Sequence, residues 1–188
     1  WKKLGENGFL CPQVDEKYGG LNADFGFAVI TSEEMDRVSV GMVGVGLHND
    51  IVIPYLESYG TEEQKEKWLP GAVSGDLISA VAMTEPNTGS DLANIQTTAV
   101  LDGDHYVVNG EKTFITNGHI ADIYIVAVKT DTEVKPAHRG ISLLVIEAGT
   151  PGFTKGKKLA KVGQHASDTA ELIFQDVRVP KENLLGEE

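Results

Sequence analysis

Apolar residues recur with two different spacings along this chain. Up to about residue 76 they recur every three to four positions, as in helices with one apolar face, most clearly over 23–37. From residue 77 onward, short β-branched runs are separated by Gly, Asn, Asp and Pro, which is typical of strands. The pattern predicts an α+β chain with an all-α helical domain over 1–76 and a β domain over 77–188.

The helical domain contains several recognisable elements. Residues 23–37 are expected to bury Phe27 and Ile30 on one side of a helix. The glycine-rich stretch 39–47 is expected to be a buried helix, because each glycine costs about 1 kcal/mol relative to alanine and close packing must offset that cost.

Two short helices are expected to complete this domain. We expect Asn49 and Asp50 to cap a helix over 51–59, with Pro54 in its first turn. Thr61 and Gln64 have the spacing of a capping box, which predicts the start of another helix that ends before Pro70.

The β domain is expected to be an antiparallel barrel or sandwich. Tight turns at 102–104 and at Asn109–Gly110 predict hairpins, and hairpins between short strands leave no room for crossover helices. Residues 130–138 form the one long polar loop. The predicted strands are 77–83, 95–101, 106–108, 112–116, 123–128, 141–146 and 172–177.

Composition narrows the class of protein. A formal net charge of −12 argues against a nucleic-acid partner, because such binding depends on Lys and Arg neutralising phosphates. No apolar run approaches the roughly 20 residues of a membrane-spanning helix, and the best run is 123–128. The single cysteine, Cys11, excludes an internal disulfide and favours a reducing compartment, and we expect it to be a small buried residue. No targeting segment is visible at Trp1.

The segment 83–91, MTEPNTGSD, interrupts the β pattern between two predicted strands. Such a break leaves backbone N–H groups unpaired, and Thr84 and Ser90 add hydroxyl groups. Together these donors suit phosphate oxygens or the pyrimidine edge of a flavin. The composition alone also allows a plain surface turn.

The segment 112–118, KTFITNG, has Phe114 and Thr116 two positions apart, on one face of a regular strand. An aromatic plane beside a hydroxyl can stack on a planar ring and form a hydrogen bond with its edge. The alternative is an ordinary strand that buries Phe114 in the core. Spacing alone leaves both interpretations open.

Other arrangements do not have the spacing of known sites. The glycines at 152 and 156 with Lys157 do not form a phosphate-binding P-loop, and Gly41, Gly44 and Gly46 do not form a dinucleotide fingerprint. The groups 48–50 and 165–168 have no second ligand pair and no nucleophile elbow, so we predict no metal site.

The two motifs together resemble a known family. MTEPNTGSD at 83–91 followed by NGEKTFITNG at 109–118 resembles the paired flavin-binding signatures of the acyl-CoA dehydrogenases. Three more segments agree: GTEEQKEKWLP, SDTAELIFQDVRVP and KENLLGEE. The resemblance spans the whole chain, and DTAELIFQDVRVP and PAHRGISLLVIE are most similar to the long-chain branch.

The resemblance implies FAD as cofactor and assigns positions to it. Met83 and Thr84 match positions that face the pyrimidine edge of the flavin, and Ser90 matches a serine near the pyrophosphate and the CoA of the substrate. Phe114 stands where many relatives have tryptophan, and Thr116 matches the threonine that points at flavin N5. The full expected cofactor set is Val81, Ala82, Met83, Thr84, Gly89, Ser90, Phe114, Ile115 and Thr116.

The resemblance also implies an activity: α,β-dehydrogenation of acyl-CoA thioesters in fatty acid β-oxidation or related catabolism. Electrons would pass to electron-transfer flavoprotein, and the complete protein would be a homotetramer, cytoplasmic in bacteria or in the mitochondrial matrix of eukaryotes. The family's catalytic glutamate belongs to a C-terminal helical domain that we expect to be absent from this chain, so no catalytic residue is assigned, and we expect weak FAD binding by the 188 residues alone.

Two alternatives to this activity remain. The first is a flavin-dependent monooxygenase or oxidase built on the same fold. The second is a non-catalytic barrel module.

Overall fold

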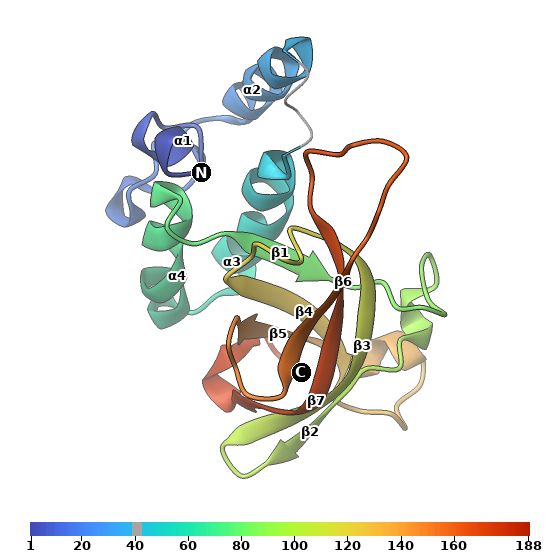
Figure 1. Ribbon diagram of the computed structural model, residues 1–188. Coiled ribbons are helices and arrows are strands. Elements are labelled where there is room, and N and C mark those ends of the chain that lie inside the picture. Colours follow the sequence, from blue (N-terminus) through green and yellow to red (C-terminus); the bar gives the residue numbers. More distant parts are fainter. Residues whose placement is uncertain (39–42) are drawn as a thin grey trace.

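The computed structural model describes residues 1–38 and 43–188. Its first part is helical, with α1 (Lys2–Glu6), α2 (Phe25–Arg37), α3 (Ile53–Tyr59) and α4 (Glu62–Ser74). A π-helix, Leu47–Val52, leads directly into α3. In Figure 1, α1, α3 and α4 lie together beside the sheet, whereas α2 stands apart at the upper end. The helix expected over 39–47 lies partly outside the described residues.

The second part is one eight-stranded sheet with the order β6-β7-β3-β2-β4-β5-β8, with β1 beside β4. Most pairs are antiparallel, as expected, but β1 runs parallel to β4, and β2 and β4 meet in parallel at Thr98 and Lys129. The strand path of the described residues is open, with β6 and β8 at its ends. The strands are β1 (Ser79–Ala82), β2 (Thr98–Asp102), β3 (His105–Thr116), β4 (Ile123–Lys129), β5 (Ile141–Glu147), β6 (Phe153–Lys158), β7 (Thr169–Pro180) and β8 (Leu184–Leu185).

The hairpin turn predicted at Asn109–Gly110 is wrong. The two strands expected on either side of it are one strand, β3, whose pairing with β7 shifts register between Val108 and Gly110. Gly110 has φ +147, and a Cβ there would lie 2.5 Å from Thr97 Oγ1. The glycine therefore accommodates a bulge against Thr97 instead of a reversal of the chain.

Two strands, β6 and β8, were not predicted from the sequence. β6 has the sequence FTKGKK, in which Phe153 is the one large apolar residue. Because β6 lies at the edge of the sheet, it buries little apolar surface and its sequence lacks the apolar pattern of a strand. β8 has only two residues. The strand expected from residue 95 begins at Thr98, after a 3-10 turn over Leu92–Asn94.

Helix α4 confirms the capping box but extends past the predicted end. Thr61 Oγ1 accepts from Gln64 N–H, and Gln64 Oε1 accepts from Thr61 N–H. The helix continues through Pro70 to Ser74, so the predicted stop before Pro70 is wrong. Burial of Ala72 and Val73 beyond the proline offsets the lost backbone hydrogen bond.

Asn49 and Asp50 do not cap a helix as expected, because both lie inside the π-helix. The Asn49 side chain instead accepts from Cys11 N–H at 2.9 Å and donates to the Phe9 carbonyl at 2.9 Å. Cys11 is fully buried there, as expected.

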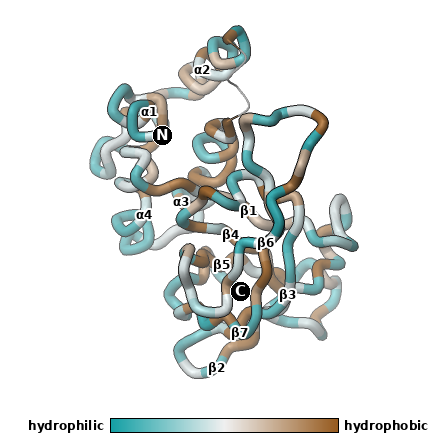
Figure 2. The backbone as a smooth tube through the Cα atoms, in the orientation of Figure 1, coloured by the Kyte–Doolittle hydropathy of each residue, from teal (hydrophilic) through white to brown (hydrophobic). Residues whose placement is uncertain are grey.

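The apolar side expected for 23–37 is exposed. Phe27 is 53% exposed and Ile30 is 61% exposed, and α2 has no buried residue. Figure 2 shows apolar and polar positions mixed along this helix. Periodicity identified the helix correctly, but Phe27 and Ile30 face away from the core, whereas Met35, near the end of the helix, is half-buried against it.

Two apolar clusters form the core. One joins the helices to the sheet, with Trp68 and Leu69 of α4 against Ile125 and Val145. The other lies within the sheet and contains Tyr106, Tyr124 and Phe174. The first cluster packs the helical part against the sheet.

No helix within the described residues is long and apolar enough to cross a membrane.

Candidate functional site

The fold brings the two sequence motifs into direct contact. Segment 83–91 begins where β1 ends, and segment 112–118 forms the end of β3 and the turn after it. The Thr113 N–H donates to the Thr84 carbonyl at 2.9 Å, and Lys112 Nζ donates to the Met83 carbonyl at 3.0 Å. The two motifs therefore form one continuous surface.

The first motif forms a loop that is closed at its base. Glu85 and Thr88 exchange backbone hydrogen bonds of 2.9 and 3.0 Å. The Glu85 carboxylate also accepts from Gln96 N–H at 2.5 Å and from Thr97 N–H at 2.9 Å. The Glu85 carboxylate thus connects the start of the segment 85–97 to its end. The loop is therefore more constrained than a plain surface turn.

Lys112 and Glu85 form a buried ion pair between the motifs. Their charged atoms lie 2.9 Å apart, and their side chains are 0% and 4% exposed. Burial lowers the pKa of Lys112, opposed by Glu85. Burial alone would raise the pKa of Glu85, but hydrogen bonds from Thr97, Gln96 and Lys112 outweigh it and leave that pKa below its ordinary value. The sequence-based reasoning missed this pair, although each motif contains one of its charges.

Phe114 projects outward from β3. Its side chain is 67% exposed, so the alternative of a core phenylalanine is wrong. Its φ is +59, a rare conformation for a bulky residue, at a register shift between Lys112 and Ile115. Bulges re-aim side chains near active sites, and strained residues cluster at such sites. The neighbouring Ile115 is buried in the core, so its side chain faces away from the surface.

The remaining expected site residues differ in their exposure. Val81, Met83, Thr84 and Thr116 are half-buried, Ala82 is buried, and Gly89 and Ser90 are exposed. Among the described residues, the hydroxyls of Thr84, Ser90 and Thr116 have no hydrogen-bond partner. These three hydroxyls are available to a ligand.

The turn after Thr116 is held by Asp168, from the segment before β7. Asp168 Oδ2 accepts from His119 N–H and Ile120 N–H at 2.5 and 3.2 Å, and its carbonyl accepts from Asn117 N–H at 3.0 Å. Asn117 Nδ2 donates to the Ser79 carbonyl of β1 at 3.2 Å. Asp168 belongs to the rejected group 165–168 and to the family-like segment SDTAELIFQDVRVP, but neither pattern indicates its role in this turn.

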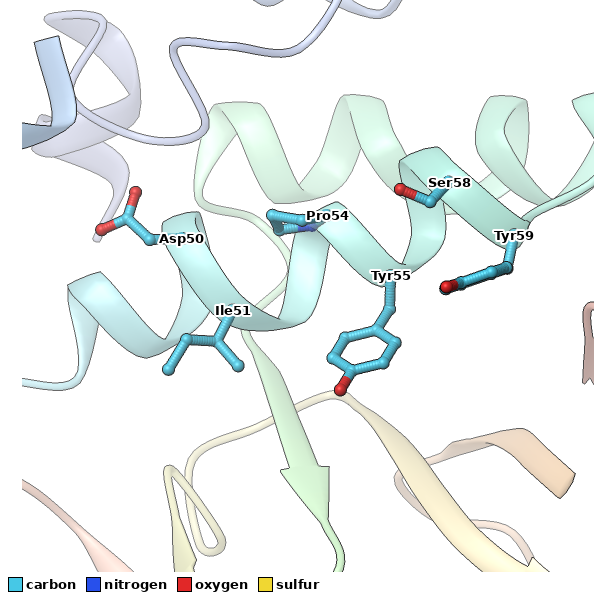
Figure 3. A pocket seen from close by; sticks show the side chains of 6 residues that line it. All are labelled: Asp50, Ile51, Pro54, Tyr55, Ser58 and Tyr59. Carbon is cyan, nitrogen blue, oxygen red and sulfur yellow. The ribbon is translucent and has the colours of Figure 1, made fainter. Parts of the chain in front are cut away.

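A separate hollow lies on the surface of α3 and the π-helix, lined by Asp50, Ile51, Pro54, Tyr55, Ser58 and Tyr59. Figure 3 shows that all six side chains come from one helical run. Partial burial raises the pKa of Asp50. None of the motif residues lines this hollow, so it is distinct from the site built around Phe114.

The site around Phe114 has the chemistry of a surface for a planar, hydrogen-bonding ring. It combines an exposed aromatic face with unpartnered hydroxyls on two anchored segments, and a Cβ at Gly89 would meet nothing within 4 Å. An isoalloxazine ring, which is flat and has hydrogen-bonding atoms along its edge, fits this donor set. These features are typical of a flavin-binding domain.

Family comparisons are more specific. Residues 1–76 match the N-terminal domain of acyl-CoA dehydrogenases, and residues 80–177 match the middle domain. The chain belongs to the acyl-CoA dehydrogenase family.

Individual relatives agree with this assignment. The chain is 46% identical over its whole length to mouse mitochondrial long-chain specific acyl-CoA dehydrogenase, of which it covers 44%. It is 70% identical to the crystal structure of an acyl-CoA dehydrogenase from Geobacillus kaustophilus, with a TM-score of 0.98 over all of this chain and 50% of that one. A chain in a structure titled as the electron transferring flavoprotein of Acidaminococcus fermentans is 43% identical, with a TM-score of 0.94 over 100% of this chain and 49% of that one. The chain thus spans about half the length of these relatives.

Proposed function

We propose that the protein containing this chain is an FAD-dependent dehydrogenase that oxidises acyl-CoA thioesters between their α and β carbons. The observation that carries the proposal is Phe114, an exposed aromatic ring in a strained conformation on a strand that is hydrogen-bonded to the segment of Thr84. Membership of the acyl-CoA dehydrogenase family supplies the substrate class.

The roles proposed for the chain's residues follow from their positions. Phe114 stacks on the ring plane, and the Thr116 hydroxyl donates a hydrogen bond to the ring edge near N5. Met83 and Thr84 serve the pyrimidine edge, where donors stabilise the negative charge that reduction creates. The hydroxyl of Ser90, on the exposed loop, serves the pyrophosphate and the CoA substrate.

The other proposed contacts use mainly backbone groups. Ala82 and Ile115 have buried side chains, so their peptide groups are the parts available to a ligand. Gly89 gives open backbone at the loop tip. Val81, one residue before the end of β1, completes the set.

The chemistry divides between cofactor and protein. Bound FAD supplies the acceptor for the β-hydride of the thioester. Removal of the α-proton requires a base, and we assign this base to a part of the protein beyond these 188 residues, since the chain spans about half of its relatives. Hydrogen bonds to the thioester oxygen are also needed as enolate character develops.

We further propose electron-transfer flavoprotein as the electron acceptor and a homotetramer as the assembly. The similarity to a chain in a structure titled for an electron transferring flavoprotein supports the acceptor. Membership of the family supports the tetramer.

The test is anaerobic reduction of the FAD-loaded protein. Addition of a series of saturated acyl-CoA thioesters is expected to bleach the flavin absorbance and yield the trans-enoyl-CoA with at least one of them. Oxidation of free carboxylic acids or amines without any reaction of the thioesters would contradict the proposal. Rapid reoxidation by air, with hydrogen peroxide or an oxygenated product, would instead identify an oxidase or monooxygenase.

A further inference from the structure

The buried pair of Lys112 and Glu85 lies where the two motifs join. Lys112 Nζ contacts both the Met83 carbonyl and Glu85 Oε1, at 3.0 and 2.9 Å. Met83 and Glu85 flank Thr84, whereas Lys112 lies two residues before Phe114. One ammonium group therefore fixes the backbone beside a proposed flavin-edge hydroxyl to the strand that carries the aromatic ring.

Glu85 extends this connection to the far end of the loop. Its carboxylate accepts from the N–H groups of Gln96 and Thr97. Thr97 in turn packs against Gly110, where β3 bulges. Three chain segments thus meet at a single carboxylate, and the exposed loop that carries Gly89 and Ser90 leaves from this junction.

Stability alone does not require charges at this junction. Replacing a buried ion pair by uncharged residues of similar volume is often neutral or stabilising, because both charges have lost their hydration. A pair of charges does, however, hold its segments in one arrangement, since any displacement leaves a buried charge unpaired. Charges at this junction therefore suit a positional role better than a contribution to folding.

We propose that Glu85 and Lys112 are positioning residues for flavin binding. They hold the loop 86–95 against β3, so that the hydroxyls of Thr84 and Ser90 and the ring of Phe114 face one ligand before it binds. The inference rests on the proposed FAD site. Its expected signature is a loss of FAD affinity without a comparable loss of stability of the apoprotein.

The test uses the complete protein, stripped of flavin, with the double variant Glu85→Gln/Lys112→Met. The apoprotein is expected to melt within about 3 °C of the wild type. Its dissociation constant for FAD, from quenching of flavin fluorescence, is expected to rise about tenfold or more. Amide hydrogen exchange over 86–97 is expected to accelerate in the apoprotein.

The matched control is the exposed pair Asp102 and Arg178, which joins β2 and β7 at 2.8 Å with side chains 65% and 53% exposed. The variant Asp102→Asn/Arg178→Met is expected to leave FAD affinity and loop exchange unchanged. Glu85→Asp is the milder second variant. It keeps the charge but shortens the reach to Gln96 and Thr97, and it is expected to weaken FAD binding severalfold in a folded protein.

Two outcomes would overturn the inference. One is wild-type FAD affinity in the folded double variant. The other applies if the double variant does not fold: wild-type FAD affinity in Glu85→Asp would then overturn the inference. Failure of the wild-type protein itself to bind FAD would instead contradict the proposed function, so the two failures are distinguishable.

Discussion

The N–H of Thr113 donates to the carbonyl of Thr84, 29 positions earlier in the sequence, at 2.9 Å. This bond places the first motif against the second at the point where β3 bulges. It explains in physical terms why the two motifs are informative as a pair. Each contributes one side of a surface that neither forms alone.

Thr116→Val tests the hydroxyl proposed to meet the ring edge. Because valine keeps the shape and removes one hydrogen bond worth about 1 kcal/mol, FAD affinity is expected to fall about fivefold. Thr154→Val, on the exposed side of β6, is the control and is expected to change nothing. Fluorescence titration of the apoprotein with FAD measures both. Equal affinity in the two variants would contradict a hydrogen bond from the Thr116 hydroxyl to the cofactor, and unchanged activity of Thr116→Val in the complete protein would favour a non-catalytic module.

Phe114→Gly is expected to change stability and binding in opposite directions. Glycine adopts φ +59 without penalty, so the free energy of unfolding of the apoprotein should rise by about 1 kcal/mol. FAD affinity should fall roughly tenfold as the stacking surface is lost. Phe114→Ala keeps the backbone strain and removes the ring, so it should lose FAD affinity without gaining stability. Urea denaturation and flavin titration measure the two effects, and a large loss of stability in the glycine variant would contradict this account.

Gly110→Ala is expected to destabilise the sheet by more than about 2 kcal/mol. Its new Cβ would lie 2.5 Å from Thr97 Oγ1 and 2.7 Å from Thr97 Cα, at φ +147. Gly149→Ala, at φ +85 with nothing within 4 Å, is the control and should cost only the backbone strain, about 1 kcal/mol. Thermal unfolding compares them. Equal losses of stability in the two variants would mean that Thr97 moves away from the new Cβ at no cost, which would contradict this prediction.

His48 should make the helical part sensitive to acid. It is fully buried, with Nε2 3.1 Å from the Ala72 carbonyl and Nδ1 2.7 Å from Ser79 Oγ. A carbonyl only accepts, so Nε2 carries the hydrogen, and Nδ1 accepts from Ser79 N–H at 3.1 Å, so the ring is neutral. Burial lowers the pKa of His48 to about 4 from its ordinary 6.5.

The unfolded chain therefore binds this proton first, and stability is lost as the pH falls from about 6.5 towards 4. Between pH 7 and pH 5 the loss from His48 is about 2 kcal/mol. Urea denaturation at pH 7 and pH 5 measures the difference in the free energy of unfolding between the two pH values. This difference should be smaller in His48→Gln and unchanged in the control His138→Gln, whose histidine is exposed. An unchanged pH dependence in His48→Gln would rule out this source.

Sequence patterns predicted most of the fold because they report local physics. Periodicity located the helices, and the capping box marked the start of α4 at Glu62. The errors lie where tertiary contacts override local signals. Pro70 stays helical because the residues after it are buried, and Asn109–Gly110 stays extended because Gly110 packs on Thr97.

The candidate site was predictable only in part. Two motifs identified Thr84, Ser90, Phe114 and Thr116 as candidates, but spacing did not indicate which way Phe114 faces, since a bulge changes the alternation of strand residues. The pairing of Glu85 with Lys112 was equally hidden. Charged residues are usually solvated, and only the fold reveals that these two are buried together.

The most direct test of the central claim is the visible spectrum of the complete wild-type protein after incubation with FAD and removal of the unbound cofactor. The protein is expected to be yellow with about one flavin per chain, and the Phe114→Ala variant is expected to retain less flavin under the same washing. A colourless, folded wild-type protein that takes up no FAD would contradict the central claim.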